Sequence, residues 1–183
     1  DAVGLADEHP PARVREARST GHDVLVTSGG ASVGEYDLMR EVVAAEGASL
    51  GFWKIAMRPG KPLLMADLGP MRLLGLPGNP VASFVCAMIF LVPLLRRLGG
   101  QPVSAEPGEE AVLGADLPAN DQRADHLRAH LTVEGGRLVA TPFEVQDSSM
   151  IRVLAESDGL ILRPPYAPAA AAGSTCRVLR LDR

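Results

Sequence analysis

The chain has 183 residues, 46% of them hydrophobic and 22% charged, so it can bury the core of one domain or of two small ones. A formal net charge of -4 without a basic block argues against a nucleic-acid partner, which usually requires a clustered cationic face. The two cysteines, Cys86 and Cys176, are far apart and lack metal-ligand spacing. A cytoplasmic protein without a disulfide scaffold is therefore expected.

The first hundred residues alternate strand and helix patterns, which predicts a parallel sheet with crossover helices. In chain order we expect a strand at 3–6, a helix at 11–19, a strand in DVLVT, a helix at 36–46, and strands at 63–66 and 72–76. A long apolar helix should start at Pro80 and end at Gly99 and Gly100. Its uncharged run is shorter than the roughly 20 residues of a membrane span, so we interpret it as a buried helix and expect no membrane partner. The start, DAVGLADEHP, shows no signal peptide.

The pattern changes beyond residue 101, where prolines and glycines separate short strand-like stretches such as HLRAHLTV and RLVATPF. This spacing is typical of a small antiparallel barrel or sandwich, so we place a boundary near Gln101 between domains 1–100 and 101–183. His126 and His130 have the spacing of a helical metal pair. The alternation of the residues around them indicates a strand instead, so we expect no metal there.

The sequence GLPGNP, residues 75–80, lies where a strand passes into the apolar helix. Asn79 is a strong N-cap residue and Pro80 suits the first helical position. The free backbone N–H groups at residues 81–83 should then point over the carboxyl end of the preceding strand. Together with the positive end of the helix dipole they predict an anion site, although packing alone would also explain the turn.

The loop TSGGASVGEYD is a second passage from a strand to a helix. It offers hydroxyl groups and glycines that allow close backbone approach to a phosphate: Thr27, Ser28, Gly29, Gly30 and Ser32. If the two strands are neighbours, both loops lie at one edge of the sheet, where ligands bind in open α/β folds. Two such loops favour a small anionic ligand over packing alone.

Only two lysines occur in the chain, Lys54 and Lys61, and Arg58 lies between them in WKIAMRPGKP. A lysine suits an oxyanion as a point charge, although a solvated loop would also account for the pair.

Acidic residues open the helix that follows the TSGG loop. Glu35 and Asp37 lie where the helix dipole favours negative charge, which explains them without a ligand. The alternative is that one of them, with Asp7 or Glu8, binds Mg²⁺ through oxygen ligands beside bound phosphates.

Four segments, in this order, resemble the molybdopterin molybdenumtransferase family, MoeA and the gephyrin E domain: DVLVTSGGASVGEYD, FWKIAMRPGKP, GLPGNPVASF and DSSMIRVLAESDGLILRPP. The resemblance implies an α/β fold, with a three-layer molybdopterin-binding domain on a parallel or mixed sheet, truncated at its N-terminus, and then a small antiparallel β-barrel. It implies insertion of molybdenum from molybdate into adenylated molybdopterin, with Mg²⁺ and release of AMP. Full members are homodimers with further N-terminal domains, so this C-terminal half alone is expected to be inactive. A non-catalytic, dimerising scaffold module is the alternative.

The resemblance also implies roles for single residues. Asp37 is the acidic residue needed for activity, and Pro77 and Pro80 shape the pocket. The implied molybdate ligands are Arg58, Lys61 and Ser83, completed by Arg128 and by Ser148 or Ser149 of the second domain. Lys54 joins the cofactor-binding set, and Glu8, which replaces a family aspartate, joins Glu35 and Asp37 as a metal ligand.

Overall fold

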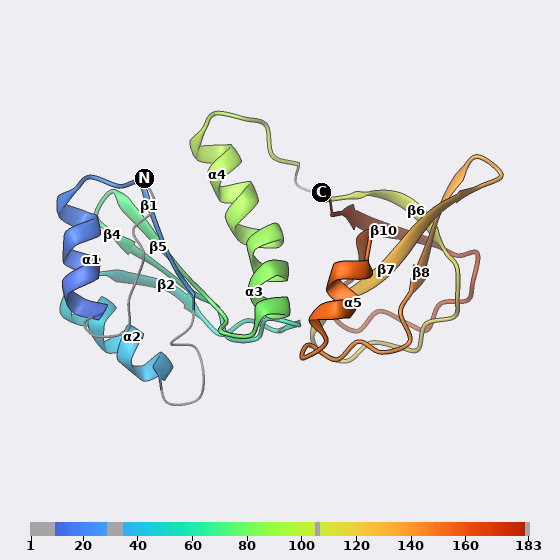
Figure 1. Cartoon of the computed structure of the whole chain (residues 1–183), viewed down its shortest axis with the longest axis horizontal. Helices are drawn as coiled ribbons and strands as arrows, with labels where there is room; N and C mark the ends of the chain where they lie inside the picture. The colour runs from blue at the N-terminus through green and yellow to red at the C-terminus, as the bar shows by residue number, and fades with distance from the viewer. Residues whose placement is uncertain (1–9, 29–34, 105–106, 182–183) are drawn as a thin grey trace. The chain divides into compact units, whose positions relative to one another are not determined.

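The computed structural model describes residues 10–28, 35–104 and 107–181, except for the side chains of residues 10, 35–38 and 40 (Figure 1). The strand expected at 3–6 lies outside these ranges. Contacts divide the chain into two compact units, one of Asp1–Ile55 with Gly60–Leu91 and one of Ala56–Pro59 with Val92–Arg183. The segment Ala56–Pro59 therefore belongs to the second unit, although it lies in the sequence between two parts of the first.

The first unit holds a four-stranded mixed sheet in the order β1-β5-β4-β2. Its elements are α1 (Pro10–Ser19), β1 (Val24–Ser28), α2 (Glu35–Ala45), β2 (Ser49–Trp53), β4 (Leu64–Leu68) and β5 (Met71–Leu76). Only β1 and β5 are parallel, whereas the β5–β4 and β4–β2 pairs are antiparallel. Of the parallel and mixed sheets that the resemblance left open, the mixed one is confirmed, because the tight turn at Gly69 and Pro70 joins β4 to β5 and a turn this short reverses the chain.

The core of this unit lies between the sheet and the helix pair α1 and α2, which lie side by side (Figure 1). Val14 and Val43 are 1% exposed and Leu73 is completely buried. The helical patterns predicted at 11–19 and 36–46 are confirmed to within one residue at each end.

A continuous helical segment follows β5 and consists of α3 (Pro80–Cys86), the π-helical η1 (Ala87–Leu91) and α4 (Val92–Leu98). The predicted start at Pro80 and end at Gly99 are confirmed. The wide turn η1 lies just before Pro93, whose nitrogen cannot donate a helical hydrogen bond.

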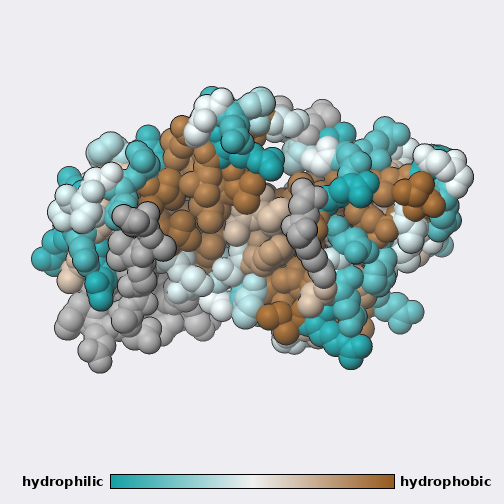
Figure 2. Space-filling model, turned by 45° about the horizontal axis from the view of Figure 1, so that its top comes forward, coloured by the Kyte–Doolittle hydropathy of each residue, from teal (hydrophilic) through white to brown (hydrophobic). Residues whose placement is uncertain are grey.

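This helical segment is less buried than the sequence predicts. Buried side chains occur only in α3, so the expectation of a buried helix is wrong beyond Cys86. Phe84, Leu95 and Leu98 are 40–51% exposed, and a broad apolar area is visible in Figure 2. By length and composition alone the segment could cross a membrane, a test that core helices of other proteins also pass.

The second unit contains a closed five-stranded barrel, with one short strand added to it, so the barrel is confirmed as one of the two alternatives that the sequence pattern left open. Its elements are β3 (Met57–Arg58), β6 (Glu109–Leu113), β7 (Ala124–Glu134), β8 (Arg137–Pro142), α5 (Ile151–Glu156), β9 (Gly159–Arg163) and β10 (Thr175–Arg180). The strand order is β3-β7-β8-β6-β10-β9, and pairing of β7 with β9 closes the barrel. Most pairs are antiparallel, but β6–β8 and β3–β7 are parallel. The sandwich alternative is therefore wrong.

Candidate functional site

The two candidate anion loops start at adjacent points of the first unit's sheet. In the parallel β1–β5 pair, Thr27 lies opposite Gly75 and Ser28 lies opposite Leu76. A Cβ atom at Gly75 would lie 3.3 Å from the Thr27 hydroxyl oxygen and 3.3 Å from the Leu64 Cβ, so glycine permits this close approach. The carboxyl ends of both strands therefore meet at one edge, the arrangement that the sequence analysis required for a shared ligand site.

The helix start after GLPGNP has the predicted cap. The Ala82 N–H donates to the Asn79 side-chain oxygen over 3.0 Å, and the Ser83 N–H donates to the Asn79 carbonyl over 2.8 Å. Free N–H groups at residues 81–83 were expected, and this is wrong for Ala82 and Ser83 because the cap itself uses them. The site at this end thus has the helix dipole, the Val81 N–H and the half-buried Ser83 side chain. Of the two prolines, Pro77 is buried and Pro80 is exposed.

Lys54 and Lys61 lie at the end of the β2–β4 ladder. The Lys54 N–H donates to the Leu63 carbonyl over 3.0 Å, and the Ile55 N–H donates to the Lys61 carbonyl over 2.9 Å. Both lysine side chains are exposed, and the Lys54 ammonium lies 3.8 Å from the centre of the Trp53 ring. This cation–π contact directs the Lys54 charge to an aromatic face, whereas Lys61 has no such contact among the described residues.

The segment around Lys61 lies against the start of the helix. The Cys86 thiol contacts the Gly60 carbonyl with a sulfur–oxygen distance of 3.8 Å. Cys86 is fully buried, and burial raises the pKa of its thiol to about 12, in agreement with the predicted core role. Lys61 therefore follows a residue that contacts the helix one turn beyond Ser83.

Arg58 belongs to the second unit and is paired there with carboxylates. Its Nη2 donates to the Asp125 Oδ2, and its Nη1 lies 3.8 Å from the Asp121 Oδ2. Hydrogen bonds from the Arg123 side chain and backbone lower the pKa of Asp121 to about 2. These acidic partners could not be identified from the sequence, because their contact with Arg58 depends on the pairing of β3 with β7.

Arg128 is the most deeply buried cation among the described residues, with 1% of its surface exposed. Its backbone N–H donates to the Gln146 Oε1 over 3.0 Å, and its Nη1 donates to the Asp147 carbonyl over 3.0 Å. Burial lowers the pKa of this guanidinium, while the nearby Asp147 charge opposes the change. The Arg128 Nη2 is buried and has no hydrogen-bond partner within the described ranges.

The segment held by Arg128 carries the predicted Ser148 and Ser149. Gln146 returns a hydrogen bond from its Nε2 to the Arg128 carbonyl over 2.9 Å. The Ser149 N–H donates to the Asp147 Oδ1 over 2.7 Å, and the hydrogen bonds of Ser149 lower the pKa of that carboxyl. Arg128 and Ser148 therefore lie in one hydrogen-bonded part of the second unit, although no sequence pattern indicates the role of Gln146.

Two family models match the chain. Residues 6–97 match the model of a probable molybdopterin binding domain, and residues 110–181 match that of the MoeA C-terminal region, domain IV. The chain belongs to the MoeA family.

Relatives of this MoeA-family chain are considerably longer. It is 34% identical over 157 residues to the molybdopterin molybdenumtransferase of Bacillus subtilis, which covers 86% of this chain and 36% of the relative. It is 32% identical over 158 residues to that of Haemophilus influenzae, with 85% and 39% covered. A crystal structure of the molybdopterin biosynthesis MoeA protein from Pyrococcus horikoshii matches with a TM-score of 0.73 and 25% identity, over 94% of this chain and 40% of that one. The chain thus spans about two fifths of the length of these proteins.

Some of the residues predicted to form the site of this MoeA-family chain are not among those that the structure describes. Glu8, Gly29, Gly30 and Ser32 fall outside the described residues, as do the side chains of Glu35 and Asp37 in the first turn of α2. Among the residues that the structure does describe, no three His, Cys, Asp or Glu side chains are grouped to hold a metal ion. The Mg²⁺ ligands Glu8, Glu35 and Asp37 therefore remain predictions.

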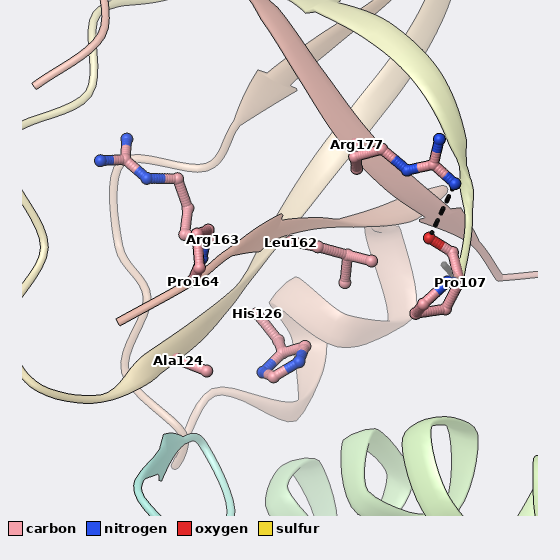
Figure 3. Close-up of a pocket in the computed structure, with 7 residues that line it drawn as sticks. All are labelled: Pro107, Ala124, His126, Leu162, Arg163, Pro164 and Arg177. Carbon is pink, nitrogen blue, oxygen red and sulfur yellow. Dashed lines mark hydrogen bonds between the residues drawn. The ribbon is translucent and has the colours of Figure 1, made fainter. Parts of the chain in front are cut away.

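The barrel of the MoeA-family chain also has a mostly apolar hollow of about 400 Å³ (Figure 3). Leu162 of β9 pairs with both His126 of β7 and Arg177 of β10, so these residues form one row across three strands. The Arg163 guanidinium points away from the hollow, while Arg177 donates to the Pro107 carbonyl over 3.3 Å. None of the predicted site residues lines it.

Proposed function

We propose that this chain supplies the binding sites for adenylated molybdopterin and molybdate in a molybdopterin molybdenumtransferase. The reaction inserts molybdenum from molybdate and cleaves the phosphoanhydride, so that AMP leaves. The observation that carries the proposal is the pairing of Thr27 with Gly75. It brings the strand ends that precede the TSGG and GLPGNP loops to one edge of a sheet, in a chain whose two halves match MoeA-family models. Small-molecule substrates, a cytoplasmic location and a homodimer in the full-length protein belong to the same proposal.

The phosphates of the substrate lie along the TSGG loop, where backbone N–H groups and hydroxyls neutralise their charge. The donors in this role are Thr27, Ser28, Gly29, Gly30 and Ser32, and Lys54 completes the set from the end of β2, at the other side of the sheet. Pro77 and Pro80 fix the backbone of the second loop. Glu8, Glu35 and Asp37 would hold Mg²⁺, whose charge would stabilise the leaving phosphate.

Molybdate binds to cations and hydroxyls in this proposal. The ligands that the family resemblance implies are Lys61, Ser83, Arg58, Arg128 and Ser148. The contact of Gly60 with Cys86 supports the pairing of Lys61 with Ser83. An exposed ammonium offers an oxyanion a charge that is not already committed to a carboxylate, and Lys61 meets this condition within the described residues.

The test replaces the matched 157 residues of the Bacillus subtilis relative by this chain. The chimera is expressed in a strain that lacks its own transferase, and activity of a molybdenum-dependent enzyme is measured against added molybdate. We expect restored activity, and we expect the chimera with Lys61→Ala to need at least about tenfold more molybdate because it loses one charge–charge contact. Lys54→Ala is the comparison: this lysine is assigned to the phosphates and its ammonium lies on Trp53, so its loss should lower activity without raising the molybdate requirement. An unchanged molybdate requirement for Lys61→Ala would contradict its assignment.

A further inference from the structure

The backbone of Arg58 is fixed on the edge of the barrel. In the parallel β3–β7 pair, Met57 lies opposite Ala124 and Arg58 lies opposite Asp125. The Ala124 N–H donates to the Ala56 carbonyl over 2.8 Å, which extends the pairing to the residue before β3. The start of the Arg58 side chain is therefore set by the barrel and not by the first unit.

Asp125 fixes the other end of this side chain. The Asp125 side chain is only 8% exposed, whereas that of Arg58 is 48% exposed. The Asp125 Oδ2 accepts from the Arg58 Nη2, and its Oδ1 is buried without a partner among the described residues. A guanidinium has five N–H donors, so a single bond along one edge leaves others directed to solvent.

Asp121 has a different relation to Arg58. Its Oδ2 is 3.8 Å from the Arg58 Nη1, beyond hydrogen-bond distance, and it accepts instead from the Arg123 Nη2 over 2.6 Å. Its side chain is 46% exposed. Asp121 thus adds negative charge near Arg58 without orienting the guanidinium.

We propose that Asp125 is a positioning residue that holds the Arg58 guanidinium with its exposed donors ready for a tetrahedral oxyanion. This rests on the proposed function, in which Arg58 is a molybdate ligand. A long arginine side chain loses rotamer freedom when it binds a ligand, and a guanidinium that is already fixed has lost that freedom before the ligand arrives. Removal of Asp125 has two opposite effects on anion binding. It removes a negative charge that repels the anion, and it removes the hydrogen bond that orients the Arg58 guanidinium. In this proposal the loss of orientation has the larger effect.

The binding test measures the dissociation constant for sodium molybdate by calorimetric titration of the whole chain. We expect Asp125→Asn to weaken binding roughly tenfold. The variant loses the fixed geometry of the Arg58 guanidinium, and this loss outweighs the gain from removing a negative charge. Asp125→Glu should restore part of the affinity. The matched control is Asp121→Asn, which also removes a negative charge near Arg58 and should leave binding equal or tighter. Equal effects of both asparagine variants, or tighter binding by Asp125→Asn, would show that only charge matters and would overturn the proposal.

Arginine variants separate this proposal from the proposed function. If Arg58→Ala and Arg58→Lys bind molybdate as the wild type does, or if the wild-type chain binds none, the molybdate role of Arg58 fails. Arg58→Lys is included because Arg58→Ala leaves the buried Asp125 carboxylate without its partner and therefore threatens folding. If these variants bind weakly while Asp125→Asn binds normally, Arg58 keeps its role and the positioning role of Asp125 is refuted.

A ligand-free measurement tests the orientation directly. In ¹⁵N spectra of the arginine side chains, the Arg58 guanidinium of the wild type should rotate slowly and give separate Nη signals. Asp125→Asn should average these signals, whereas Asp121→Asn should leave them separate. A freely rotating Arg58 guanidinium in the wild type would refute the proposal whatever the affinity for molybdate.

Discussion

Substitution of Asn79 separates the structural role of the helix start from its proposed role in anion binding. Asn79→Ala removes the 3.0 Å hydrogen bond that the Ala82 N–H donates to the side chain, so the free energy of unfolding should fall by about 1 kcal/mol. Asn79→Asp keeps an acceptor and adds a negative charge at the positive end of the helix dipole. Its stability should therefore equal that of the wild type or exceed it by a few tenths of a kcal/mol.

For anion binding the order should be reversed: Asn79→Asp, the more stable variant, should bind an anion more weakly than Asn79→Ala. A carboxylate about 4 Å from a bound anion costs about 1 kcal/mol per unit of anion charge even in water, hence about 2 kcal/mol, or about thirtyfold in affinity, for a dianion such as molybdate. Asn79→Ala adds no charge and should bind within about threefold of the wild type. Urea unfolding followed by circular dichroism and calorimetric titration with molybdate measure the two quantities. Asn79→Asp that binds as tightly as the wild type would refute an anion at this helix start, and Asn79→Ala of unchanged stability would refute the cap.

Three further predictions concern packing and domain organisation. Gly75→Ala places a methyl group 3.3 Å from the Thr27 hydroxyl and the Leu64 Cβ, so the free energy of unfolding should fall by about 1–3 kcal/mol; an unchanged urea midpoint would contradict this. Burial raises the pKa of Cys86 to about 12, so a thiol reagent at neutral pH should modify Cys176 first, and peptide mass mapping that finds Cys86 modified in the folded chain would count against its burial. Limited proteolysis should cut between Gly99 and Gly108, and stable fragments that break within residues 20–90 would argue against the boundary near Gln101.

Features determined by nearby residues could be predicted from the sequence. The cap at Asn79 and Pro80 needs only the backbone N–H groups three and four residues ahead, so its residue types identify it. The alternation from His126 to Val133 likewise indicates a strand, because side chains of one strand point to opposite faces. These signals were sufficient for the helix start and for the strand β7 of the barrel.

Features that depend on distant partners could not be predicted. The strand β3 has two residues, and its partners Ala124 and Asp125 lie more than 60 positions along the chain, so no local pattern indicates it. The same pairing decides that Arg58 contacts acidic side chains of the barrel. Arg128 was expected to be a molybdate ligand, and its hydrogen bonds to Gln146 and Asp147 depend on a segment folding back over β7. Its local sequence carries no sign of this.

The last prediction concerns the pH dependence of stability through His126. Burial lowers the pKa of this imidazole below its ordinary value of 6.5, while the hydrogen bond to the Arg58 backbone and the charge of Asp125 oppose the change. Between the folded pKa and 6.5 the unfolded chain binds more protons than the folded chain, so the free energy of unfolding falls as the pH falls through this interval.

His126→Gln cannot take up a proton and should flatten this part of the profile, even if the loss of packing lowers its stability at every pH. Asp121 and Asp147, whose pKa values are lowered, lose their contributions only as the pH falls below their ordinary value of 3.8, so the interval from about pH 5 to 6.5 isolates the imidazole. Urea midpoints measured across this interval give the slope, and proton NMR of the His126 ring gives its pKa directly. A ring that titrates at or above 6.5 in the folded chain, or equal slopes for wild type and variant, would refute the lowered pKa of His126 and the desolvation that causes it.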